Sequence, residues 1–94
     1  MKITIGCFKI PVKFIRTSKV GSDCAGKSIF GYPKIYIDID QPLFRQQEAL
    51  IHEIVEQINH MYELNLKHQT TQTLGLALCQ ALSNKRIIKF LIKD

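Results

Sequence analysis

The sequence contains no tryptophan, no long apolar run and no closely spaced pair of cysteines. Because no apolar run approaches the roughly 18 residues of a membrane span, we do not expect the chain to cross a membrane. The first ten residues, MKITIGCFKI, lack the continuous apolar stretch and small-residue cleavage site of a secretory signal. These absences predict a soluble protein located in the cytoplasm.

The cysteines are few and scattered. Cys7, Cys24 and Cys79 are odd in number, and no C-x-x-C pair occurs. This pattern argues against a disulfide framework and against a zinc knuckle built from cysteines. Hydrophobic residues make up 46% of the chain and charged residues 22%, which is an ordinary globular balance without a sign of disorder. With 94 residues the chain can build one modest core, so we predict a single domain over residues 1–94.

The net charge of +5 raises the question of nucleic-acid binding, but the distribution of the charges argues against such binding. Residues 1–33 hold six lysines or arginines and one acid, whereas residues 34–94 hold seven of each. Positions 38–63 contain six acidic residues and one basic residue, Arg45. An acidic segment repels phosphate and favours a cation. The chain also shows no stacking-aromatic motif or recognition helix, so a nucleic-acid partner ranks last among the partners considered.

The first 40 residues are typical of β-structure. Residues 2–15 are rich in β-branched and aromatic types, and they predict a strand with a bend at Gly6 and an edge or break at Pro11. Two short strands are expected at 28–32 and 34–39, joined through a proline in a tight antiparallel hairpin. Alternation in the last strand places three isoleucines on one face: Ile35, Ile37 and Ile39.

After residue 40 the hydrophobic period changes from two to about 3.6. Asp40 is a good N-cap for a helix that runs to about Tyr62, and a second helix is expected from about Thr70 to Leu82. For the tail, residues 86–94, a last helical turn and a strand remain open. The predicted fold class is α+β, with a small antiparallel sheet of about three strands followed by two packed helices.

Residues 21–28, GSDCAGKS, match the phosphate-loop pattern G-x-x-x-x-G-K-[ST]. That pattern binds phosphate only when a helix follows it directly. Here the next residues, IFGYPKIYID, alternate and contain a proline, which favours a strand. We therefore interpret the match as accidental.

The segment LIHEIVEQINH, residues 50–60, has the spacing of a metal site. His52 and Glu56 are one helical turn apart, about 6 Å along the axis, so both side chains can hold one cation. In H-E-x-x-H zinc hydrolases the two outer residues bind the metal and the glutamate is the general base, the role that Glu53 would take here. His68 is the best candidate for a third ligand. His60 is its rival, but it lies about 12 Å along the helix from His52.

This block resembles a group of small, mostly phage-encoded proteins whose central segment reads H-E-x-x-E-x-I-N and then E-L-x-L-x-H, followed by a leucine-rich helix. The resemblance covers about residues 28–92, including the I-x-I-D strand that begins at Ile35. Those proteins are usually regarded as relatives of zincin-like metallopeptidases. The resemblance implies a zincin-like fold, a role for Asn59 and His68, and a location in the cytoplasm of a phage-infected host. Relative to the zincins, Glu56 stands where the second histidine would be.

Two functions follow. The first is a zincin-like metalloprotein in which His52, Glu56 and His68 hold zinc and Glu53 activates water to hydrolyse an amide bond. The second is a non-catalytic phage accessory protein that binds a host protein, with the same residues forming a purely structural polar cluster. In both, the expected partner is a protein or peptide.

Overall fold

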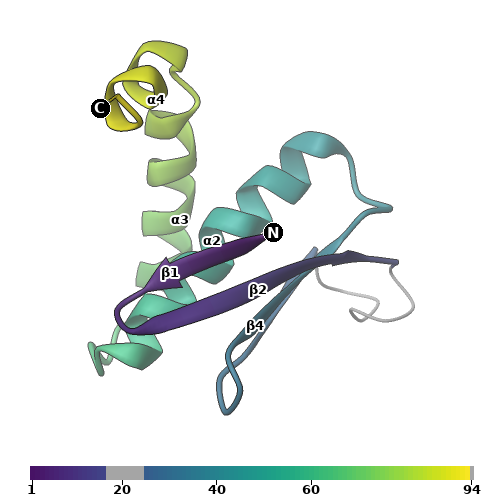
Figure 1. Ribbon diagram of the computed structural model, residues 1–94, viewed down its shortest axis with the longest axis vertical. Helices are drawn as coiled ribbons and strands as arrows, with labels where there is room; N and C mark the ends of the chain where they lie inside the picture. The colour runs from purple at the N-terminus through teal and green to yellow at the C-terminus, as the bar shows by residue number, and fades with distance from the viewer. Residues whose placement is uncertain (17–24, 94) are drawn as a thin grey trace.

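The computed structural model describes residues 1–16 and 25–93, in which four strands form one sheet and three helices follow it (Figure 1). In chain order the elements are β1 (Lys2–Ile5), β2 (Phe8–Ile15), β3 (Gly26–Ile29), β4 (Lys34–Asp38), α2 (Leu43–Met61), α3 (His68–Leu82) and α4 (Lys85–Leu91). The predicted α+β class is therefore confirmed. None of these helices in the described parts of the chain is long and apolar enough to cross a membrane.

The sheet has the strand order β1-β2-β4-β3 and is mixed. The expectation of about three antiparallel strands is wrong in two respects. Residues 2–15 form a hairpin, because Gly6 adopts a positive φ of 58° that turns the chain back on itself. In addition, β2 and β4 run parallel, from Val12 beside Ile35 to Ile15 beside Asp38. Pro11 does not break β2, because it precedes Val12, the first residue paired with β4.

The predicted antiparallel hairpin is confirmed, but its first strand spans Gly26–Ile29 and not residues 28–32, because residues 30–33 form the turn. β3 and β4 pair antiparallel, with Ser28 opposite Ile35 and Ile29 opposite Lys34. The fully buried side chain of Gln57 on α2 holds the two ends of the turn. It donates hydrogen bonds to the carbonyl oxygens of Ile29 and Lys34 at 3.0 and 3.3 Å. In the sheet formed by the described residues β3 lies at the edge, beside β4, and it packs next to α2.

The core lies between the sheet and α2. Its fully or nearly buried members are Ile5, Ile10, Val12, Ile35 and Ile37, and partly buried residues of α2 such as Leu50, Ile54 and Ile58 pack against them. These helix residues follow the period of about 3.6 expected from the sequence, and they form the face that covers the sheet. Ile39 does not belong to the core and is 43% exposed, because the strand ends at Asp38.

The helix starts also differ from the prediction. Asp40 is not the N-cap of α2; Pro42 takes that position, and no side chain caps the helix. The chain turns instead around buried Asp38, whose carboxylate accepts bonds from the Asp40 amide and the Gln41 side chain at 2.9 and 3.2 Å. The second predicted helix is confirmed as α3, beginning two residues earlier than expected.

The tail is helical. The side chain of Asn84 accepts a hydrogen bond from the Arg86 amide at 2.9 Å and starts α4. The helix α4 lies at the end of α3 that is remote from the sheet (Figure 1).

Candidate metal centre

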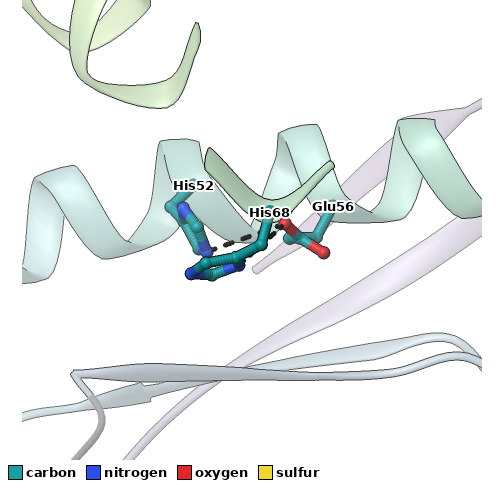
Figure 2. A group of neighbouring side chains, drawn as sticks. All are labelled: His52, Glu56 and His68. Carbon is teal, nitrogen blue, oxygen red and sulfur yellow. Dashed lines mark ion pairs between the residues drawn. The ribbon is translucent and has the colours of Figure 1, made fainter. Parts of the chain in front are cut away.

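Three side chains from two helices converge on one point (Figure 2). His52 and Glu56 come from neighbouring turns of α2, and His68 is the first residue of α3. The Oε1 atom of Glu56 lies 3.9 Å from Nε2 of His52 and 4.0 Å from Nδ1 of His68. One ligand atom from each residue lies within 4.8 Å of the other two. The expected convergence of the three residues is present, and the cluster could hold a metal ion.

His68 reaches the site because the connector between α2 and α3 is short and firmly held. Glu63 and Asn65 both adopt positive φ values, 51° and 55°, which fold the chain back sharply. Asn59 then clamps Leu66 with two hydrogen bonds, one accepted from its amide at 2.9 Å and one donated to its carbonyl at 3.3 Å. The clamp places the start of α3 beside Glu56. It supplies a physical role for Asn59, which helical spacing alone did not suggest.

Two glycines let neighbouring elements approach the site closely. A Cβ atom on Gly75 of α3 would lie 3.2 Å from the Cα of His52, so the two helices touch there backbone to backbone. A Cβ atom on Gly26 of β3 would lie 3.1 Å from Cγ of Glu53. Neither close approach was predicted from the sequence. The signal for Gly75 was available, since a glycine inside a leucine-rich helix costs about 1 kcal/mol and needs a packing reason.

Along this contact α2 and α3 run in opposite directions, because His68 meets Glu56 whereas Gly75 meets His52. That arrangement predicts His68 near the later turns of α2, close to His60. His60 nevertheless lies outside the cluster: its ring stacks on Phe30, with centroids 4.4 Å apart and planes 28° apart. His68 instead lies beside His52, in an edge contact with a centroid distance of 5.7 Å.

Glu56 carries the clearest sign that the cluster is incomplete. Its Oε1 atom is buried and accepts no hydrogen bond from any residue in the described segments. A buried carboxylate oxygen without a donor is costly, and a cation would satisfy it. Ligand atoms around a tetrahedral ion with bonds of about 2.1 Å lie about 3.4 Å apart. The observed separations of up to 4.8 Å are larger, so the ligand atoms would have to move closer together to bind such an ion.

Glu53 lies between the cluster and the sheet. Its side chain is 7% exposed, and Oε1 accepts a hydrogen bond of 2.8 Å from the Ser28 hydroxyl on β3. Burial raises the pKa of Glu53 above its ordinary value, while the bond from Ser28 and the nearby His52 oppose that rise. Ser28 was the last residue of the rejected phosphate-loop pattern, and it holds this carboxyl group instead. Residues 21–24 of that pattern lie outside the described residues, but Gly26–Ile29 form a strand and no helix follows.

An open groove of about 510 Å³ runs over the site. Its polar part includes His52, Glu53 and His68. Further along it are Phe44 and Leu76, two exposed apolar side chains. A ligand lying in the groove would therefore contact the histidines and the buried carboxyl group together, with an apolar portion alongside.

The chain was compared with protein-family models, with curated proteins and with solved structures, and none of the three comparisons gave a match.

Proposed function

We propose that this protein is a zinc-binding, zincin-like metalloprotein that hydrolyses amide bonds in a peptide or protein. The observation that carries the proposal is the convergence of His52, Glu56 and His68 around a buried carboxylate oxygen that lacks a donor. Two imidazoles and one carboxylate form a ligand set of catalytic zinc sites, which keep a fourth position open for water or substrate. Two of the three ligands, His52 and His68, line an open groove, which is consistent with such a position.

Zinc held there would polarise a substrate carbonyl group and acidify a water molecule. Glu53 would accept the proton from that water, because it lines the same groove as His52 and His68. The Ser28 hydroxyl donates to Oε1, so the proton would go to the other carboxylate oxygen. A raised pKa suits this role, since a general base works best when its pKa approaches the working pH. The proton can then pass from Glu53 to the leaving amine.

The first experiment measures zinc in the purified protein and titrates the metal-free protein with zinc. We expect one ion per chain, and a weakening of binding by at least about 100-fold in His52→Ala. His60→Ala is the matched control, because His60 is a histidine of the same helix that stacks on Phe30 outside the cluster. Equal zinc affinity in the two variants would contradict the site.

The second experiment separates binding from catalysis. Glu53→Gln should keep zinc and lose hydrolysis of a peptide library, because the amide cannot accept the proton. Zinc at 100 times its dissociation constant should stabilise the fold by about 2.7 kcal/mol, which is a rise in melting temperature of about 10–20 °C for a domain of this size. A melting temperature insensitive to zinc and to chelator would favour a purely structural polar cluster in a non-catalytic binding protein.

A further inference from the structure

A second groove, of about 710 Å³, lies among the three helices. It is bounded by α2, α3 and α4, and it does not include any residue of the metal cluster. Its apolar lining comes from four side chains: Leu50, Ile51, Leu82 and Ile88. The first three are half-buried, so they form a recessed floor, and Ile88 of α4 is 38% exposed at its edge.

One wall of this groove is positively charged. Lys85 and Lys89 line it together with Ile88, because residues one turn apart on α4 share a face. Arg86 follows Lys85 on the same helix, about 100° further around its axis. Among residues 1–16 and 25–93, no acidic side chain lines the groove, and the sequence has none between positions 85 and 93. The groove is thus an apolar trough with a basic edge.

We propose that this groove binds an acidic amphipathic helix of another protein. Leucine-like side chains on one face of such a helix would fill the recessed floor, and carboxylates beside them would meet Lys85 and Lys89. A second copy of this chain fits poorly, because a twofold contact through the groove would bring the same lysines against each other. A flat bilayer surface fits poorly as well, because Leu50, Ile51 and Leu82 on the floor are only partly exposed.

The test uses a fluorescent synthetic helix with leucines at i, i+3, i+4 and i+7 and glutamates elsewhere, and a second peptide with lysines in place of the glutamates. We expect the acidic peptide to bind and the basic peptide to fail. The double change Lys85→Glu and Lys89→Glu should weaken binding by about tenfold or more. The double change Lys9→Glu and Lys13→Glu is the matched control, because it alters the net charge equally at exposed positions on β2. It should leave binding nearly unchanged at physiological salt.

A second pair of variants tests the apolar floor. Ile88→Ser should weaken peptide binding by about tenfold, whereas Phe90→Ser should not, because Phe90 lies about 160° around α4 from Ile88. Melting curves verify that the variants are folded, which their exposed positions favour. Four results would each overturn the proposal. The first two are that the acidic peptide does not bind and that both peptides bind equally well. The third is that the protein binds only phosphatidylserine vesicles, in a way that depends on Phe90. The fourth is that the protein dimerises and that Ile88→Ser abolishes the dimer.

Discussion

The close contact between Gly75 and the backbone of His52 leads to a quantitative prediction for Gly75→Ala. The new Cβ atom would lie 3.2 Å from Cα and 3.5 Å from Cβ of His52, so α3 must move away from α2 by a few tenths of an ångström. Overpacking of this kind costs about 1–3 kcal/mol. Alanine recovers about 1 kcal/mol through its higher helix propensity. We therefore expect a net loss of about 0–2 kcal/mol in the free energy of unfolding, where propensity alone predicts a gain.

The same movement should weaken zinc binding, because it separates His68 on α3 from His52 and Glu56 on α2. The ligand atoms must already draw together from as much as 4.8 Å, so we expect the affinity to fall by about tenfold. Urea unfolding and zinc titration of the same variant measure the two effects. Gly31→Ala is the control, because its Cβ would meet no atom within 4 Å. A Gly75→Ala protein that is stabilised by about 1 kcal/mol and binds zinc normally would refute the reasoning.

Three further predictions concern buried polar groups. Because burial raises the pKa of Glu53, its contribution to the stability of the metal-free fold is fully present below the ordinary pKa of a glutamate and is lost as pH rises through the raised value. Metal-free Glu53→Gln should therefore be more stable than the natural protein at about pH 7 and no more stable at about pH 4; urea unfolding that shows a pH-independent difference would contradict this. Asn59→Ala removes both bonds to Leu66 and should cost about 1–3 kcal/mol and weaken zinc binding, measured by denaturation and titration. Gln57→Leu leaves the carbonyl groups at the β3–β4 turn without their buried donor and should cost about 1–3 kcal/mol, but zinc affinity should not change.

The sequence was most informative where structure depends on near neighbours along the chain. The 3.6-residue period of α2 is a local property, so it correctly predicted the helix and put His52 and Glu56 on one face. The hairpin of β3 and β4 was predictable for the same reason. The cap at Asp40 was predicted wrongly because a buried carboxylate, Asp38, organises the turn, and burial cannot be read from residue type alone.

The tertiary structure decided what depends on residues far apart. The parallel pairing of β2 with β4 joins residues more than 20 positions apart, such as Val12 and Ile35. A local sequence pattern cannot encode it. The same holds for the candidate site: helical spacing supplied two ligands, but the third arrives through the clamp at Asn59 and the close helix contact at Gly75. Ser28 reaches Glu53 across 25 residues of sequence, because an edge strand lies beside the helix. Local spacing fixes which side chains share a helix face, whereas packing between elements determines whether those side chains meet others to form a site.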